Sequence, residues 1–136
     1  MTEEFEQLLI GIDVGSTTTK AVAVREDDEE ILYSEYKRHN ADQLQSVINA
    51  IGRLKERFAG SRIRVALTGS GARNIGEAAG LPFVQEVVAN SIVLKKKYSG
   101  VKTAIELGGQ DAKIIFFHND ETTGKINVSG MRMNGT

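Results

Sequence analysis

The sequence predicts an α/β fold, with a mixed β-sheet and helices on both of its faces. A short apolar run and two alternating runs open the chain, which is typical of strands, and apolar residues then recur at the spacing of a helix face. A β-branched run and further helical segments follow, so the predicted order is βββαβαα and then the start of a second βββ. A meander followed by a helix-linked strand gives a mixed sheet.

An antiparallel meander of three strands opens the predicted fold. The first strand is a short apolar run, the second alternates with small residues, and the third alternates apolar and polar positions. The acidic stretch 25–30 forms the turn between the second strand and the third. The three strands are predicted at residues 8–13, 20–24 and 31–36.

The first helix follows the meander. Its start is predicted at a cap formed by Asn40 or Asp42 and its end near Gly60, because short polar side chains cap helix N-termini and glycine commonly ends helices. One face of this helix is apolar. That face consists of Leu44, Val47, Ile48, Ile51, Leu54 and Phe58.

The rest of the chain is predicted as a strand, two helices and a second meander. The strand runs into glycines and a short helix that reaches about Ala79 and is closed by Gly80. The second meander begins like the first, with a strand that runs into glycines, which is a weak internal repeat. We therefore assign residues 1–100 to a first lobe and residues 101–136 to the opening strands of a second lobe. The remaining elements are strands at 63–67, 101–107, 112–117 and 125–128 and a helix at 84–98.

Composition and charge exclude several classes of function. The formal net charge is −1 and the basic residues are scattered, unlike the basic patch of a nucleic-acid-binding protein. The one dense basic run, 95–97, suits the C-terminal end of a helix. No apolar stretch is long enough to cross a membrane, and the acidic first residues do not fit a secretory signal. We expect a cytoplasmic protein without nucleic-acid or membrane partners.

A first candidate phosphate-binding site lies where the first strand ends. The carboxylate of Asp13 is followed by a glycine and four hydroxyl residues before the next strand starts. Backbone N–H groups and hydroxyls in such a turn can form a nest for phosphate, and Asp13 could hold Mg²⁺ through water. The alternative is an ordinary threonine-rich hairpin turn. The predicted nucleotide-binding residues are Gly15, Ser16, Thr17, Thr18 and Lys20, and Asp13 is the predicted catalytic and metal-binding residue.

A second candidate site repeats this pattern later in the chain. Glu106 ends a strand, and Gly108 and Gly109 let the backbone approach a ligand closely. The alternative is a two-residue glycine hairpin with polar neighbours. Two such hairpins in one domain favour a site that holds a polyphosphate from both sides. We predict that Glu106, Gly108, Gly109 and Asp111 bind the nucleotide, that Glu106 also holds Mg²⁺ through water, and that Gln110 is catalytic.

A third glycine-rich stretch, at residues 68–71, follows a strand and opens a helix. It is not a dinucleotide-binding fingerprint, because Asn74 stands where the third glycine would be, and no P-loop sequence occurs in the chain. A helix-entry turn and a ligand site both fit it.

Three single residues are weaker candidates. Glu86 stands near the start of the third helix, where it could polarise a water molecule as a catalytic residue or complement the helix dipole. His39 and His118 are lone histidines, and we expect neither to be catalytic.

The two hairpins, in this order, resemble the phosphate-1 and phosphate-2 motifs of the actin-like ATPase superfamily of sugar kinases, actin and heat-shock chaperones. The closer resemblance is to the ATPase family that holds the activators of 2-hydroxyacyl-CoA dehydratases and the ATPase subunits of benzoyl-CoA reductases. Residues 9–17 (LIGIDVGST) are similar to that family's opening strand and turn. Residues 68–74 (TGSGARN) resemble its T-G-x-G-R stretch, and residues 105–111 (IELGGQD) resemble I-D-I-G-G-Q-D. The resemblance covers essentially the whole chain.

This resemblance implies a ribonuclease-H-like, actin-type ATPase lobe that binds ATP and Mg²⁺. Such activators are homodimers that bridge a [4Fe–4S] cluster and use ATP hydrolysis to transfer one electron at very low potential to a dehydratase or reductase component. The chain has no cysteine and stops at Thr136, before the cluster cysteine and the adenine-binding residues that the family leads us to expect. We therefore expect the cluster in a longer parent and a fragment that is inactive as an ATPase on its own. The resemblance also places Glu86 in the segment where the superfamily often keeps its water-polarising group.

One residue departs from the family pattern. Glu106 stands where the family usually has Asp, and misplacing a carboxylate by about 1 Å can lower a rate by about a hundredfold. Two alternatives to the activator are therefore open: a kinase of the same fold that phosphorylates a small sugar or carboxylate, and a regulatory or assembly domain that binds nucleotide without hydrolysing it. The pair Gln110 and Asp111 favours the activator.

The strands of the second lobe are also expected to associate with other copies of the chain. Ile114 and Phe116 would lie on a partly uncovered apolar surface, and an unpaired edge strand invites pairing. We predict self-association through residues 101–130, by edge pairing or by exchange of the hairpin. The alternative is that this segment folds back over the first lobe.

Overall fold

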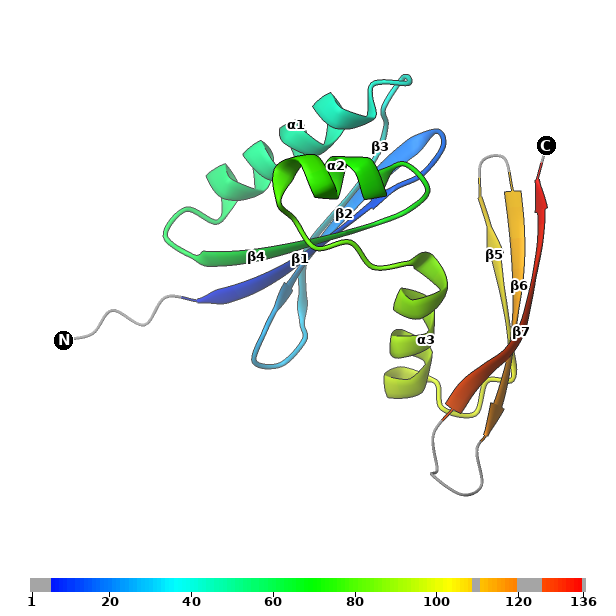
Figure 1. Ribbon diagram of the computed structural model, residues 1–136. Coiled ribbons are helices and arrows are strands. Elements are labelled where there is room, and N and C mark those ends of the chain that lie inside the picture. The colour runs from blue at the N-terminus through cyan, green and yellow to red at the C-terminus, as the bar shows by residue number, and fades with distance from the viewer. Residues whose placement is uncertain (1–5, 109–110, 120–125, 136) are drawn as a thin grey trace. The chain divides into compact units, whose positions relative to one another are not determined.

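The computed structural model describes residues 6–108, 111–119 and 126–135. The chain forms two compact units, Met1–Val84 and Gln85–Thr136 (Figure 1). The second unit thus begins at Gln85, next to the start of the third helix, whereas the lobe boundary was predicted at residue 100.

A four-stranded mixed sheet forms the centre of the first unit, with the strand order β3-β2-β1-β4. β1 pairs antiparallel with β2, and β2 pairs antiparallel with β3. β4 lies parallel to β1 on its other side. The predicted meander and mixed sheet are therefore confirmed. The strands are β1 (Gln7–Val14), β2 (Thr18–Arg25), β3 (Ile31–Arg38) and β4 (Arg62–Thr68).

One face of this sheet carries the core. Side chains alternate between the faces of a strand, and Ile10, Ile12 and Val14 of β1 are all buried on the same face. The helices α1 (Gln43–Arg57) and α2 (Ala72–Ala79) both pack against it (Figure 1). Their buried residues in this core are Val47, Ala50 and Leu54 of α1 and Ala72 and Ile75 of α2.

The helix ends follow from local side-chain chemistry. Of the two predicted caps of α1, Asp42 is the one that caps, since its Oδ1 accepts a hydrogen bond from the Gln45 N–H at 3.2 Å. α1 ends at Arg57, slightly before Gly60, which has a φ of 88°. Gly80 closes α2 in the left-handed conformation, as predicted, and its N–H donates to the Gly76 carbonyl.

The second unit is a helix on an antiparallel meander. The order β5-β6-β7 repeats the β1-β2-β3 arrangement of the first unit, as the weak internal repeat predicted. Ile115 and Phe117 of β6 form the centre of its core, and Val87 and Leu94 of the helix and Ala104 of β5 pack against them. The elements are α3 (Glu86–Lys97), β5 (Thr103–Leu107), β6 (Asp111–Asn119) and β7 (Ile126–Gly135).

The last strand is longer than the sequence predicted. We expected a weak strand at 125–128, whereas β7 reaches Gly135. Its second half is rich in polar and glycine residues, which are poor strand formers, but pairing with β6 continues from Asn119 back to Asp111 and holds it extended. In the described residues, no helix is both long and apolar enough to span a membrane.

Candidate functional site

The turn between β1 and β2 presents free backbone donors. The Gly15 N–H donates to the Thr18 carbonyl at 2.9 Å and closes the turn, and Thr18 is itself buried at the start of β2. Ser16 and Thr17 lie at the exposed tip. Within the described part of the chain, neither their N–H groups nor their hydroxyls have a hydrogen-bond partner. A tip of this kind has the donors that an anion needs.

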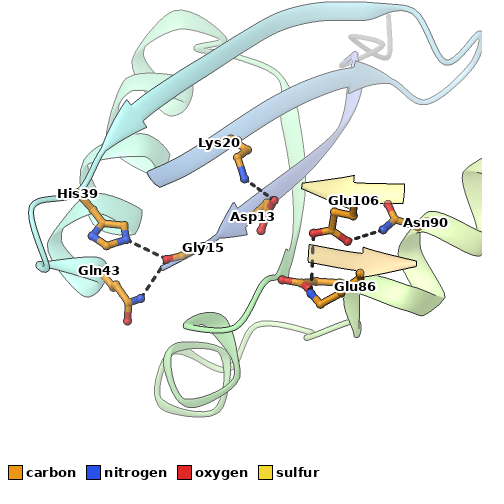
Figure 2. Close-up of polar contacts among 9 residues, drawn as sticks. Asp13, Gly15, Lys20, His39, Gln43, Glu86, Asn90 and Glu106 are labelled. Atoms are coloured by element: carbon orange, nitrogen blue, oxygen red, sulfur yellow. Dashed lines mark hydrogen bonds and ion pairs between the residues drawn. The ribbon is translucent and has the colours of Figure 1, made fainter. Parts of the chain in front are cut away.

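An ion pair stands at the base of this turn. Asp13 of β1 and Lys20 of β2 face each other in the strand register, and Lys20 Nζ donates to Asp13 Oδ2 at 3.0 Å (Figure 2). Both side chains keep about a third of their surface exposed, at 32% and 38% respectively. The ammonium of Lys20 also lies 5.8 Å from the centre of the Tyr36 ring. The predicted residues Asp13 and Lys20 are thus direct neighbours.

The other carboxylate oxygen of Asp13 is buried and has no hydrogen-bond partner among the described residues. Thr68, its neighbour in the β1–β4 register, has a buried hydroxyl in the same condition. A buried polar atom without a partner costs about 1–3 kcal/mol, so such atoms mark places where a ligand or water completes the structure.

The glycine-rich stretch after β4 packs directly against this strand end. The Gly71 N–H donates to the Val14 carbonyl at 3.0 Å. Gly69 has a φ of 103°, and a Cβ there would lie 2.3 Å from the Val14 carbonyl oxygen and 2.5 Å from Asp13 Oδ1. The glycine-rich stretch 68–71, for which the sequence allowed either a helix-entry turn or a ligand site, therefore packs against the candidate phosphate site at the end of β1.

Two side chains converge on the carbonyl of Gly15. His39 Nε2 lies 2.9 Å from this oxygen, and Gln43 Nε2 donates to it at 3.1 Å (Figure 2). His39, the first residue of the β3–α1 link, is only 6% exposed. From the sequence we expected a lone, non-catalytic histidine, and nothing suggested its contact with Gly15. Its partner is a backbone atom, which no residue pattern reveals.

A partly buried ion pair joins β3 to α1, the two elements that flank the link with His39. The guanidinium of Arg53 donates from Nε and Nη2 to the carboxylate of Glu35, at 2.9 and 2.6 Å. These hydrogen bonds lower the pKa of Glu35 below its ordinary value, more than burial raises it. The Tyr33 hydroxyl also donates to Glu35.

The acidic candidates of the second unit form a charge cluster around a lysine. Lys113 of β6 contacts Glu86 Oε2 and lies 3.8 Å from Glu106 Oε1, and its side chain is only 11% exposed. Asn90 Nδ2 donates to Glu106 Oε2 at 3.0 Å (Figure 2). Neither Lys113 nor Asn90 was predicted as a site residue from the sequence. The hairpin register signals the first of them, because Glu106 and Lys113 stand opposite each other across the glycine turn.

The remaining predicted site residues are less informative. Gly108 is exposed and Asp111 begins β6. Gly109 and Gln110 lie outside the described residues. Where the structure is described, no three Asp, Glu or His side chains are grouped as metal ligands.

Comparison with known proteins gives this geometry a context. The model of the BadF/BadG/BcrA/BcrD ATPase family matches residues 10–133. An uncharacterised protein of Methanocaldococcus jannaschii is 32% identical over 122 residues, which cover 84% of this chain and 28% of that protein.

Two solved structures share the fold. One is the activator of 2-hydroxyisocaproyl-CoA dehydratase from Clostridium difficile with bound ADPNP, at 25% identity and a TM-score of 0.72, covering 94% of this chain and 46% of that one. The other is component A of (R)-2-hydroxyglutaryl-CoA dehydratase from Acidaminococcus fermentans, at 25% identity and a TM-score of 0.66, covering 94% and 47%. The chain thus spans less than half the length of these relatives. The predicted actin-like fold is confirmed, and the chain belongs to the BadF/BadG/BcrA/BcrD ATPase family.

Proposed function

We propose that this chain is the nucleotide-phosphate-binding part of an ATPase that activates a 2-hydroxyacyl-CoA dehydratase, or a related reductase, by ATP-driven electron transfer at low potential. The observation that carries the proposal is the β1–β2 turn, where the N–H groups of Ser16 and Thr17, which have no partner among the described residues, lie beside the pair of Asp13 and Lys20. The similarity to an activator with bound ADPNP supports it.

The turn offers three kinds of donor to a phosphate. The N–H groups of Ser16 and Thr17 lie at the tip together with the two hydroxyls, and the ammonium of Lys20 lies at the base. Hydrogen bonds to an anionic oxygen are roughly twice as strong as neutral ones, so these few donors suffice for a weak phosphate site.

The donor set at Asp13 also fits Mg²⁺. Its buried Oδ1 has no hydrogen-bond partner in the described part of the chain, and a carboxylate oxygen is the ligand that water-bound Mg²⁺ uses. Mg²⁺, when bound, neutralises charge on the phosphates. Asp13 would bind the water molecules around Mg²⁺, and Lys20 would orient the carboxylate of Asp13 by donating to its Oδ2. Glu106, the second predicted metal residue, already has partners in Asn90 and Lys113.

Electron transfer requires groups that this chain does not contain. Its 136 residues include no cysteine, so they supply no thiolate for an iron–sulfur cluster. Under the proposal, the cluster belongs to a longer parent protein, whose partners are a second copy of itself and a dehydratase or reductase component. The part in hand contributes phosphate recognition.

Phosphate binding can be tested on the chain itself by NMR titration with ATP·Mg²⁺ and with pyrophosphate. We expect the amide resonances of Ser16 and Thr17 to shift with a dissociation constant in the millimolar range, or about −4 kcal/mol. Asp13→Asn should weaken the effect of Mg²⁺ on ATP binding and leave the melting temperature nearly unchanged. Unshifted amides at the turn would contradict the proposal.

A second candidate function is a domain that binds nucleotide without hydrolysing it. The observation in its favour is Lys113, which contacts Glu86 and lies near Glu106, because a carboxylate paired with an ammonium is a poor base. Steady-state ATP turnover of the full-length parent separates the two functions. Measurable hydrolysis, unchanged or raised by Glu106→Asp, supports the ATPase; no turnover in either protein supports the second candidate.

A further inference from the structure

We propose that His39 and Gln43 are positioning residues that lock the peptide unit between Gly15 and Ser16, so that the Ser16 N–H stays directed at a bound phosphate. The inference deepens the proposed function and rests on it. It assigns a role to a buried histidine and a glutamine that lie outside every motif of the sequence.

The geometry of one peptide unit links the two sides of the turn. The carbonyl of Gly15 and the N–H of Ser16 belong to the same planar trans peptide, so they point in opposite directions. His39 and Gln43 hold the carbonyl on one side, at 2.9 and 3.1 Å. The Ser16 N–H is thereby fixed on the opposite side, where the structure describes no partner for it.

The tautomer of His39 follows from its second contact. Its Nδ1 accepts a hydrogen bond from the Ala41 N–H at 3.1 Å, so the ring proton sits on Nε2 and is donated to Gly15. Asn40 and Ala41 have positive φ values of 50° and 66°, which cost free energy for residues with a side chain. This costly turn places the Ala41 N–H against the ring and aims the ring at Gly15.

Gln43 reaches Gly15 across a glycine. A Cβ on Gly71 would lie 2.4 Å from Nε2 of Gln43. The space that the Gln43 amide occupies is therefore open only because residue 71 has no side chain. Gly71 has an ordinary φ of −92°, and its conformation therefore does not require glycine. The glycine-rich stretch after β4 serves the first turn in two ways: it braces the Val14 carbonyl, and it leaves room for the side chain that braces Gly15.

Loss of both donors would free this peptide to rotate. The carbonyl of Gly15 would then be able to turn toward the phosphate, placing a partial negative charge where an N–H stood. The Gly15 N–H remains bonded to Thr18, so the hairpin itself closes as before. The expected defect is therefore in anion binding and is larger than any change in stability.

Three variants of the full chain test the inference: His39→Ala, Gln43→Leu and Gly71→Ala. Because His39→Ala empties a buried position, Gln43→Leu and Gly71→Ala provide independent tests that leave the histidine in place. Gln45→Leu is the matched control, since Gln45 lies on the same helix but its side chain donates to Asn49 and, among the described residues, makes no hydrogen bond to the turn. The readouts are pyrophosphate affinity at the Ser16 amide, the ¹³C shift of the Gly15 carbonyl without ligand, and the melting temperature.

We expect each test variant to bind pyrophosphate about three- to tenfold more weakly, the loss expected from one hydrogen bond. The Gly15 carbonyl resonance should move upfield in all three and stay in place in the control. The ¹⁵N shifts of the His39 ring should report an Nε2–H tautomer in the unmodified chain.

The outcomes separate this inference from the proposed function. If pyrophosphate fails to shift Ser16 and Thr17 in the unmodified chain, both are overturned. If these amides respond but the three variants bind like Gln45→Leu, only the positioning role is overturned. An Nδ1–H tautomer of His39 would also overturn it.

Discussion

Gly69 offers a sharp test of how tightly the stretch after β4 packs on the strand end. Alanine at this position meets two penalties. A φ of 103° is unfavourable for any residue with a side chain, which costs about 1–2 kcal/mol. Its Cβ would also stand 2.3 Å from the Val14 carbonyl oxygen, a backbone atom that moves only if the strand end moves, and such overpacking costs about 1–3 kcal/mol more.

Gly60→Ala is the matched control for Gly69→Ala. Gly60 has a similar φ of 88°, but a Cβ there would have nothing within 4 Å, so only the conformational penalty applies. Urea unfolding followed by circular dichroism should show Gly69→Ala less stable than Gly60→Ala by about 2 kcal/mol, or about 8 °C in melting temperature. Gly69→Ala should also perturb Asp13, whose Oδ1 lies 2.5 Å from the new methyl. Equal stability of the two variants would refute the close packing.

Two further predictions concern the ion pair behind the site and the surface of the second unit. Arg53→Leu should destabilise the chain by about 2 kcal/mol at neutral pH, because it leaves Glu35 buried without its charged donor. Folding lowers the pKa of Glu35, so the ion pair stabilises the folded chain at pH values above the unfolded pKa of 4.5, and this contribution is lost as the pH falls through the lower folded pKa. Urea unfolding at several pH values should therefore show the unfolding free energies of the unmodified chain and Arg53→Leu converging in acid. A difference that stays constant with pH would contradict the assignment. Self-association through residues 101–130 stays a prediction, supported by the 37% exposed Phe116 and by apolar Ile105 and Leu107 on the edge strand β5. Sedimentation at micromolar concentration should show a dimer that Phe116→Lys weakens; a monomer, or a dimer unaffected by this change, would contradict it.

The elements of the fold were predictable because each has a local signal. The short apolar run of β1 and the three- and four-residue spacing in α1 are properties of neighbouring residues, and both segments supply buried core residues, although Leu44 and Ile48 of the predicted helix face are exposed. The choice of Asp42 over Asn40 as cap was not predictable, because it depends on the left-handed turn that brings the chain out of β3. The extent of β7 was not predictable either, since its second half is held by pairing with β6.

The contacts among the predicted site residues could be predicted from the sequence only in part. The pair of Asp13 and Lys20 follows from a tight hairpin, in which residues equidistant from the turn face each other. The contact between His39 and Gly15 joins a side chain to a backbone carbonyl across the first unit. Any residue has such a carbonyl, so the sequence contains no sign of which one the histidine binds.

Lys113 reduces the negative charge that the β5–β6 hairpin and Glu86 would otherwise carry. Two carboxylates alone, Glu86 and Glu106, would repel a polyphosphate, and both would be costly to leave partly buried without a cation. The buried ammonium of Lys113 lies against one and near the other, so the cluster carries one net negative charge. Because the register of β5 and β6 places Lys113 opposite Glu106, the neutralising cation comes with the hairpin itself. The carboxylate of Glu106, the longer acid where the resemblance led us to expect Asp, is therefore bound by Asn90 and partly neutralised by Lys113.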